Sequence, residues 1–485
     1  MARNPVIFVH GYSDKGESFK KWRTILKDNG YRTEEISVCS YESLTNEVTL
    51  KDVAEGFDRA LRISSNIKED QPFDAIAHST GMLVVRSWLT SYAKRRKRLN
   101  RLIGIAPASF GSPLAQQGRS VLGAIFKGSK NLGPDFLEAG DKILDGLELA
   151  SRFTWDLAHL DLLPYDPVYN PYPEDKTTSR TFYGKDESTP YVFIFCGTKP
   201  YGGLRKLVNQ PGTDGTVRWA GCSLQTRKIT LDLTRDRNND GGNGAADGKR
   251  RVNVLRGTNI PIPVVPVEGL THGSIIKEPS PELIDGVLEA LTVSSEAEFY
   301  DWHARRGATE QNHYSYASKW GDRGGLWAQF VIHAVDERND PIPDYHLEFF
   351  ADDGNDPMEI DLDVYPYSSD KSFRCYHVDL KQINDGQITA DLLKKLHVRI
   401  IAKSGTDLVT YHGLGSERTG TGNGEDGKWD AVLNFSGLPD EAKSQAGFFF
   451  RPFSTTLIEL VMNREPLPLD AAQRNKVCYW EDFED

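Results

Sequence analysis

Several features that would assign this chain to a specialised class of protein are missing from its sequence. No apolar run reaches the roughly 18 residues that a membrane-spanning helix needs, so we predict no transmembrane helix. Positive charge is not in excess, because 58 Lys and Arg residues stand against 69 Asp and Glu residues, a net charge of −11. This balance argues against a nucleic-acid partner and against electrostatic docking of the whole chain on an anionic membrane. No repeat of fixed period occurs.

Cysteine is also scarce. The five cysteines are Cys39, Cys196, Cys222, Cys375 and Cys478. They are odd in number, scattered, and without C-x-x-C spacing, so they predict neither a disulfide framework nor a zinc site and suit a reducing compartment. A strand-like apolar run begins near Val6, so we expect no secretory signal peptide and a cytoplasmic protein. Export by a machine that needs no N-terminal signal stays open.

The length of the chain predicts two domains, because 485 residues exceed one ordinary hydrophobic core. A hydrophobic content of 39% and a charged content of 26% are typical of a globular protein. Residues 1–107 alternate between strand-like and helix-like patterns. This alternation predicts an α/β domain with a mostly parallel sheet that helices cover on both faces.

A serine lies at a predicted strand-to-helix turn in this first part. An apolar run precedes the pentapeptide Ala-His-Ser-Thr-Gly at 77–81, and a helix-like run follows it. Such a nucleophile elbow is so sharp that the residues two before and two after the serine must be small, as Ala77 and Gly81 are. We therefore interpret Ser79 as a nucleophile. His78 is expected to be structural, with its side chain directed away from Ser79.

The motif His10-Gly11-Tyr12 directly follows the first strand-like run. An early His-Gly pair forms half of the oxyanion hole in serine hydrolases with an α/β sheet, because the next backbone N–H points at the developing alkoxide. We assign one oxyanion donor to the N–H of Tyr12. The second is the N–H of Thr80, where the dipole of the following helix adds to the stabilisation of negative charge.

Two further residues complete the order Ser, Asp, His along the chain. A serine hydroxyl needs a base, and that base needs an orienting acid. Asp214 stands in a glycine-rich turn after the apolar run 191–197, and His272 follows the last apolar strand-like run. We predict His272 as general base and then acid, with Asp214 as its orienter. Glu268 and Asp232 remain alternatives for the acid.

These segments resemble the α/β-hydrolase superfamily over roughly residues 4–293. The Ala-x-Ser-x-Gly elbow resembles that of bacterial lipases and esterases, and the run Asp-Gly-Thr-Val at 214–217 is similar to the acid turn of that lipase group. The resemblance implies an α/β-hydrolase fold and hydrolysis of carboxylic esters through an acyl-enzyme, with no required cofactor. It leaves the substrate open.

Residues 108–185 interrupt the alternation of strands and helices. A helical stretch is predicted over 136–157, and an insertion at this place predicts a helical cap or lid. An apolar cap suits an acyl chain and excludes water during the reaction. Ordinary core packing explains the same leucines and stays an alternative.

One polar run fits the pattern of a calcium loop, D-x-[DN]-x-[DN]-G. Its candidate ligands are Asp236, Asn238, Asp240 and Asp247. The flanks argue against calcium, because the run 228–232 is strand-like rather than helical and the last position holds no glutamate. We favour a solvated loop.

From residue 296 onward the pattern changes to short alternating runs that turn signals separate. The clearest runs are 327–332, 347–350, 398–401 and 457–461. They predict a C-terminal antiparallel β-sandwich domain at 296–485, after a catalytic domain at 1–295. No sequence pattern in this C-terminal domain points to catalysis. Binding of a lipid surface, binding of a protein partner, and stabilisation of the catalytic domain all remain open.

The sequence thus predicts a serine hydrolase that acts on a lipid or small ester, with no nucleic-acid partner. One alternative is a phospholipase or lysophospholipase, and its delivery to membranes as an effector is left open. Peripheral contact with a membrane is left open as well. The other alternative is an interaction protein whose hydrolase fold is inactive.

Overall fold

The computed structural model of the chain consists of two compact units. The described residues are 3–11, 17–31, 37–39, 47–63, 67–68, 70–91, 97–116, 141–163, 183, 190–202, 209–234, 251–255, 262–307, 326–351, 358–359, 362–382, 396–412, 429–434, 451–468 and 473–481. The first unit comprises Met1–Arg227, Arg256–Gln329 and Pro452–Thr455. The second comprises Lys228–Leu255, Phe330–Arg451 and Thr456–Asp485.

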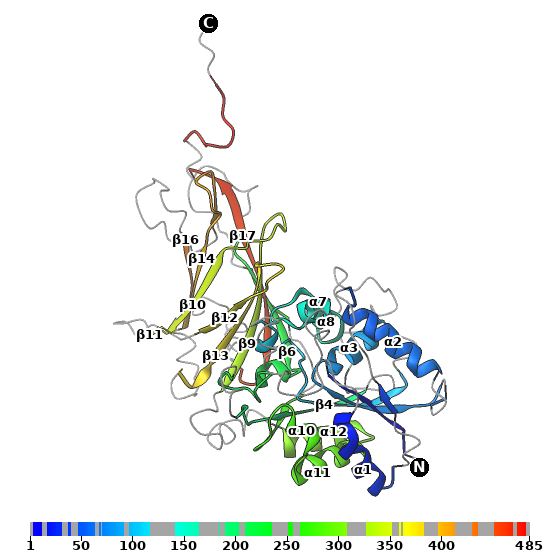
Figure 1. The fold of residues 1–485 in the computed structure, drawn as a ribbon. Coiled ribbons are helices and arrows are strands. Elements are labelled where there is room, and N and C mark those ends of the chain that lie inside the picture. Colours follow the sequence, from blue (N-terminus) through cyan, green and yellow to red (C-terminus); the bar gives the residue numbers. More distant parts are fainter. Residues whose placement is uncertain are drawn as a thin grey trace. The chain divides into compact units, whose positions relative to one another are not determined.

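A parallel sheet forms the centre of the first unit (Figure 1). Its strands are β1 (Val6–Val9), β2 (Ser37–Cys39), β3 (Phe73–His78), β4 (Leu99–Ile105), β5 (Tyr191–Gly197) and β8 (Val264–Val267). Their order is β2-β1-β3-β4-β5-β8, and all neighbours pair in parallel. Every residue of β1, β3 and β8 is buried, as expected for parallel strands with both faces covered. The predicted α/β class is confirmed.

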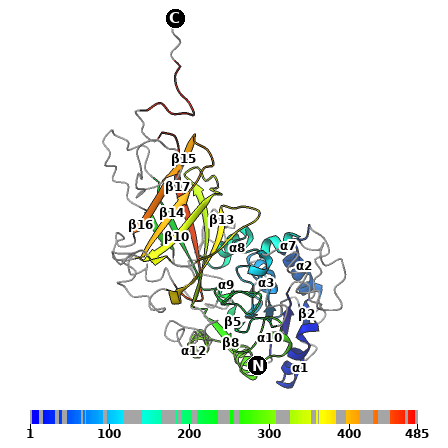
Figure 2. The same ribbon diagram turned by 60° about the vertical axis from the view of Figure 1, so that its left-hand side comes forward.

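Helices cover both faces of this sheet. They are α1 (Lys20–Asp28), which follows the short 3₁₀ helix η1 (Glu17–Phe19), α2 (Leu50–Ile63), α3 (Gly81–Ser91), α5 (Pro113–Gln116), α7 (Asp141–Leu147), α8 (Arg152–Asp161), α9 (Trp219–Cys222), α10 (Ser274–Lys277), α11 (Pro281–Ala290) and α12 (Glu296–Arg306). Figures 1 and 2 show α1, α10, α11 and α12 on one face, and α2, α3, α7 and α8 on the other. Residues 81–90 of α3 are all buried, so this helix is fixed firmly behind the elbow.

The described part of the predicted cap is helical and packs on α3. The predicted single helix over 136–157 is instead α7 and α8, because Ala150 adopts a φ of 60° and the Ser151 hydroxyl caps α8 by accepting from the Thr154 N–H. Arg86 of α3 forms an ion pair with Asp161 of α8 at 2.7 Å, with both side chains fully buried. The helices α7 and α8 therefore belong to the layer of helices that covers the sheet together with α3. The remaining predicted cap residues, at 117–140, 164–182 and 184–185, lie outside the described residues.

The second unit consists of two sheets. Apart from the first residues of β6, β9 and β17, which the first unit includes, its strands are β6 (Thr226–Asp232), β7 (Arg251–Leu255), β9 (Trp327–Asp336), β10 (Tyr345–Ala351), β11 (Met358–Glu359), β12 (Leu362–Pro366), β13 (Phe373–Asp379), β14 (Leu396–Ala402), β15 (Val409–His412), β16 (Trp429–Asn434) and β17 (Thr455–Pro466). The 3₁₀ helix η8 (Leu380–Gln382) follows β13. One sheet has the order β11-β10-β14-β16, and the other has the order β12-β13-β9-β17-β6-β7, with β15 paired to β17 (Figure 2). The buried hydroxyl of Tyr345 links them, because its single proton is shared between the carbonyl oxygens of Ile332 at 3.2 Å and Ser372 at 3.1 Å. Antiparallel pairing confirms the expected C-terminal architecture; it joins β10 to β11 and β14, β12 to β13, β14 to β16, β15 to β17, and β6 to β7.

The two units divide the chain differently from the predicted boundary between residues 295 and 296. The hairpin β6–β7 belongs to the second unit, because β6 is a neighbour of β17 in its larger sheet. The helix α12 belongs to the first unit, because Phe299 and Trp302 pack against the Phe193 ring of β5. Both differences depend on contacts between segments far apart in the chain, which the change of local pattern does not reveal.

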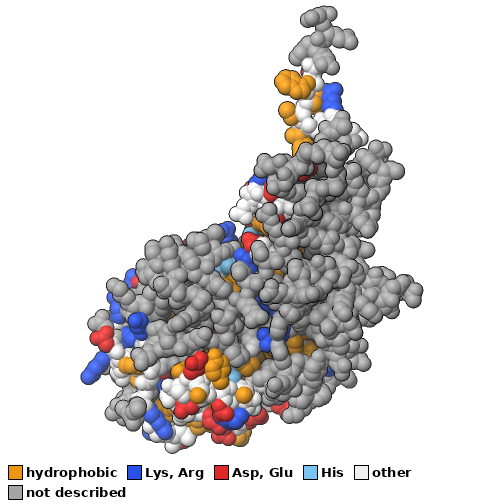
Figure 3. All heavy atoms as spheres, turned by 180° about the vertical axis from the view of Figure 1, so that it is seen from behind, with side chains coloured by type: hydrophobic (Ala, Val, Ile, Leu, Met, Phe, Trp, Pro, Cys, Tyr) orange, Lys and Arg blue, Asp and Glu red, His pale blue; other side chains and the backbone are white. Residues whose placement is uncertain are grey.

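The described surface mixes charges of both signs. On the face shown in Figure 3, the described Lys and Arg side chains are interspersed with Asp and Glu. Near the C-terminus, Val477, Tyr479 and Trp480 expose 54, 47 and 94% of their surface. None of the described helices combines the length and the apolar character that crossing a membrane requires.

Candidate active site

Ser79 occupies the sharp turn between β3 and α3. Its φ of 53° lies in the left-handed region, a strained conformation that costs a non-glycine residue about 1–3 kcal/mol. The turn brings α3 so close to β1 that a Cβ on Gly81 would lie 2.3 Å from the Val9 carbonyl oxygen. A Cβ on Gly11 would lie 2.8 Å from the Cβ of Ser79. Steric crowding around Ser79 therefore explains why small residues are needed at this turn.

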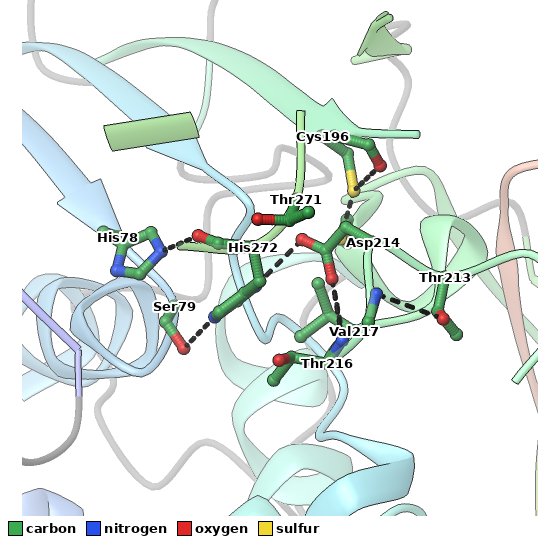
Figure 4. A network of polar contacts seen from close by, with 12 residues as sticks. His78, Ser79, Cys196, Thr213, Asp214, Thr216, Val217, Thr271 and His272 are labelled. Carbon is green, nitrogen blue, oxygen red and sulfur yellow. Dashed lines mark hydrogen bonds and ion pairs between the residues drawn. The ribbon is translucent and has the colours of Figure 1, made fainter. Parts of the chain in front are cut away.

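A continuous relay joins the three predicted residues (Figure 4). The Ser79 Oγ lies 3.0 Å from His272 Nε2, and His272 Nδ1 lies 2.8 Å from Asp214 Oδ2. Asp214 is fully buried and His272 is 7% exposed, whereas Ser79 is partly exposed. Three segments that are distant in the sequence thus meet in the order that nucleophilic catalysis requires.

The turn that carries Asp214 holds its carboxylate in one orientation. The second oxygen, Oδ1, accepts the backbone N–H groups of Thr216 at 3.0 Å and Val217 at 2.9 Å. Gly215 has a φ of 102°, and its missing side chain leaves room for the ring of Tyr201. These amide donors stabilise the negative charge of the carboxylate and leave Oδ2 free to face His272.

The three candidate acids lie at different places in the structure. Glu268 is exposed at the turn after β8, and Asp232 lies on β6 of the second unit, where its Oδ1 accepts the N–H of Thr234 at 3.0 Å. Of the three candidates, the structure brings Asp214 to the histidine.

His272 lies in the short segment between β8 and α10. Gly269 has a φ of 76° at the start of this segment. Thr271 and Ser274 then exchange two hydrogen bonds, from the Thr271 N–H to the Ser274 Oγ at 2.8 Å and from the Ser274 N–H to the Thr271 Oγ1 at 3.2 Å. These bonds close the turn around His272, and α10 begins two residues later at Ser274.

Of the two predicted oxyanion donors, one lies among the described residues. Thr80 is buried directly after Ser79 and before the first residue of α3, as expected for an N–H at a helix N-terminus. Tyr12 lies outside the described residues, although Gly11 before it approaches Ser79 closely. The assignment of both donors stays a prediction.

His78 contributes a contact that the sequence did not indicate. Its side chain is directed away from the Ser79 hydroxyl, as expected, but it reaches the backbone carbonyl of His272 at 3.1 Å (Figure 4). Burial, and then the nearby His272, hold the pKa of His78 well below its usual value of 6.5. Its neutral ring is therefore part of the wall beside the relay. In the sequence, the only indication of this contact was the position of His78 next to the predicted nucleophile. The hydrogen-bond partner of His78 depends on the fold.

Two cysteines pack beside the acid turn. The Sγ atoms of Cys196 and Cys222 are 3.4 Å apart, and both thiols are fully buried. Burial raises the pKa of both thiols, so neither is a thiolate nucleophile at neutral pH.

No group of three or more His, Cys, Asp or Glu side chains that could hold a metal ion occurs within the described ranges. The four calcium-ligand candidates, Asp236, Asn238, Asp240 and Asp247, lie outside them.

Comparison with known proteins gives one family model and several similar structures. Residues 3–97 match the family described as "Lipase (class 2)". The structure of phospholipase PlaB from Legionella pneumophila is similar over 98% of this chain and 97% of that one, with a TM-score of 0.73 and 20% sequence identity. PlaB in complex with thio-NAD gives a TM-score of 0.70 with the same identity of 20% and the same coverage of 98 and 97%.

A further similar structure is the mature lipase BlEst2 from Bacillus licheniformis, with 15% identity, a TM-score of 0.35, and coverage of 60% of this chain and 93% of that one. No match was found among curated proteins. Together with the topology, the likeness to PlaB establishes the predicted fold, an α/β-hydrolase fold with a C-terminal antiparallel β-rich part.

Proposed function

We propose that this chain, which has the α/β-hydrolase fold, is a serine hydrolase that cleaves carboxylic esters of lipid-like substrates through an acyl-enzyme. The observation that carries the proposal is the relay from Ser79 through His272 to Asp214, with contacts of 3.0 and 2.8 Å. Each residue supplies what the next one needs, and no cofactor takes part in the proposed reaction.

In the acylation step, the Ser79 Oγ attacks the ester carbonyl carbon while its proton passes to His272 Nε2. The Nδ1–H of His272 donates to Asp214, which leaves Nε2 as the proton acceptor that faces Ser79. The buried carboxylate then stabilises the imidazolium that forms. His272 gives the proton to the leaving alcohol, and an acyl group remains on Ser79.

In the deacylation step, a water molecule takes the place of the alcohol. His272 Nε2 accepts its proton, the water oxygen attacks the acyl carbon, and the returned proton restores the Ser79 hydroxyl as the acid leaves. The N–H groups of Thr80 and Tyr12 are the proposed donors to the oxyanion in both steps. Loss of one such donor typically costs about 10²–10³-fold in kcat.

The choice of lipid-like esters is supported by the match of residues 3–97 to the class 2 lipase family. A phospholipase or lysophospholipase is the second candidate. It is supported by the likeness to PlaB, a phospholipase, over 98% of this chain, which includes both units. The same relay serves either substrate, because both reactions attack an acyl ester carbonyl.

The test is hydrolysis of p-nitrophenyl esters from acetyl to palmitoyl, and of phosphatidylcholine and lysophosphatidylcholine vesicles, by the wild type and Ser79→Ala. We expect a loss of at least about 10³-fold in Ser79→Ala and covalent labelling of the wild type alone by a fluorophosphonate. A preference for long chains would support a lipid substrate, and phosphatidylcholine cleavage would favour the second candidate. A folded wild type that neither hydrolyses an ester nor takes the label would favour an inactive hydrolase fold that acts in protein interactions.

A further inference from the structure

We propose that His78 is a positioning residue for the general base: its ring N–H holds the backbone of His272 where the His272 ring reaches both Ser79 and Asp214. This inference rests on the proposed function and adds a residue to its machinery. His78 touches neither the Ser79 hydroxyl nor the Asp214 carboxylate by any hydrogen bond among the described residues, so it acts through His272.

The contact joins the end of β3 to the segment that carries the base (Figure 4). His78 Nε2 lies 3.1 Å from the His272 carbonyl oxygen, and the two ring centroids are 4.7 Å apart with an angle of 43° between the planes. His78 is 7% exposed, so water competes little for this carbonyl. A side chain adjacent to the nucleophile thereby sets the position of the base, 194 residues further along the chain.

The backbone of His272 is held from both sides. Its N–H donates to the Asp214 carbonyl at 3.0 Å, and its C=O accepts from His78. The first contact ties the base to the acid turn, and the second ties it to the elbow. The backbone of His272 is therefore held by Asp214 itself and by the residue that precedes Ser79, the two residues with which the His272 ring must work lying at these same places.

The protonation state of His78 suits this role. Donation from Nε2 requires a proton on that nitrogen, and among the described residues no group forms a hydrogen bond with the buried Nδ1. A Cβ on Gly11 would lie 3.4 Å from Nδ1, so this side of the ring faces the backbone at the predicted oxyanion loop. A neutral His78 also avoids like-charge repulsion when His272 becomes an imidazolium.

A buried histidine that bonds a carbonyl can serve packing alone, and the chain contains a matched example. His303 Nε2 lies 3.0 Å from the Val192 carbonyl oxygen, and its side chain is as deeply buried. Its carbonyl partner is on β5, and none of its hydrogen bonds reaches Ser79, His272 or Asp214. His303→Phe therefore measures the cost of losing such a bond away from the relay.

The experiment compares His78→Phe, His78→Gln and His303→Phe in the full chain. Phenylalanine keeps a ring but removes the donor, whereas glutamine places an N–H at nearly the reach of Nε2. We expect His78→Phe to lower kcat about 10- to 100-fold at nearly constant KM, as displaced catalytic groups do. His78→Gln should recover most of this loss. His303→Phe should keep the wild-type kcat even if its thermal midpoint falls as far as that of His78→Phe. Fluorophosphonate titration corrects each kcat for the fraction of competent protein.

A second readout does not need turnover. In protein labelled with ¹⁵N-histidine, the His272 Nδ1–H that donates to Asp214 should give a low-field proton signal in the wild type, His78→Gln and His303→Phe, and should broaden or vanish in His78→Phe. A wild-type kcat in His78→Phe, equal losses in both His78 variants, or an unchanged low-field signal in His78→Phe would overturn the proposal. A wild type without any esterase activity or labelling would refute the proposed function, and the proton signal would still decide whether His78 positions His272.

Discussion

His272 contacts Asp214 twice, although the two residues are 58 positions apart in the chain. The ring Nδ1–H donates to the carboxylate Oδ2 at 2.8 Å, and the backbone N–H donates to the Asp214 carbonyl at 3.0 Å. The turn that carries Asp214 therefore fixes both the main chain and the ring of His272. Only the ring contact depends on the charge of the side chain.

Because only the ring contact depends on the charge of the Asp214 side chain, Asp214→Asn tests that contact separately from the backbone contact. The amide can keep the local geometry, but it no longer demands the His272 tautomer that carries its proton on Nδ1. We expect kcat for ester hydrolysis to fall about 10⁴-fold with little change in KM. The matched control is Glu268→Gln, which changes an exposed candidate acid after β8 and should leave kcat within about twofold of the wild type. A large loss in the control and none in Asp214→Asn would show that the acid is wrongly assigned.

The steric requirement at the elbow predicts a contrast between two glycines. A Cβ on Gly81 would lie 2.3 Å from the Val9 carbonyl, so Gly81→Ala must push α3 away from β1. We expect a loss of about 1–3 kcal/mol in stability, the cost of overpacking, together with reduced activity. Gly56 lies on the exposed side of α2 with nothing within 4 Å of a built Cβ, so Gly56→Ala should stabilise by about 0.5–1 kcal/mol. Urea unfolding followed by circular dichroism measures both, and equal effects would contradict the steric account.

The ion pair between Arg86 and Asp161 predicts a strong dependence on both partners. Arg86 also donates to the Ser109 carbonyl at 2.6 Å, and the Tyr183 hydroxyl donates to Asp161 at 2.5 Å. Asp161→Leu leaves a buried guanidinium without its counter-charge and should cost about 3–5 kcal/mol in urea unfolding. The exposed α2 pair of Arg59 and Glu55 supplies the control, since Glu55→Ala should cost less than about 1 kcal/mol.

If the unpaired charge of Arg86 causes the loss of stability in Asp161→Leu, the double variant Arg86→Met with Asp161→Leu should recover much of that loss. A double variant as unstable as Asp161→Leu alone would instead assign the loss to packing.

His303 predicts an acid-dependent loss of stability. Burial lowers its pKa from 6.5 to about 3, with the bond to the Val192 carbonyl opposing the shift. In the unfolded chain this histidine takes up a proton below its ordinary pKa, whereas in the folded protein it stays neutral until about pH 3. Its protonation therefore favours the unfolded chain as the pH falls through this window, by about 1.4 kcal/mol per pH unit.

The measurement is urea unfolding of the wild type and His303→Phe from pH 7 to pH 4. The stability of His303→Phe relative to the wild type should rise as the pH falls below about 6.5. A difference that does not change with pH would mean that His303 titrates alike in both states.

Features that local geometry imposes could be predicted from the amino-acid sequence alone. The small residues around Ser79 are required by the turn itself, and the apolar runs that become β1, β3, β5 and β8 carry their strand character in their own composition. Chain order and turn chemistry were sufficient to single out His272 and to favour Asp214. Periodicity along the last third predicted antiparallel strands, because alternation is a property of each strand alone.

Features that depend on contacts between distant segments became visible only in the folded protein. The contact of His272 with Asp214 depends on the approach of the loop after β5 to the loop after β8. The bond from His78 to the His272 carbonyl depends on the end of β3 lying beside the same loop. The transfer of the β6–β7 hairpin to the second unit depends on the place of β6 beside β17. Local sequence fixes which residues can turn, extend or donate a hydrogen bond, but the partner of each group is set by the alignment of strands that are far apart in the chain.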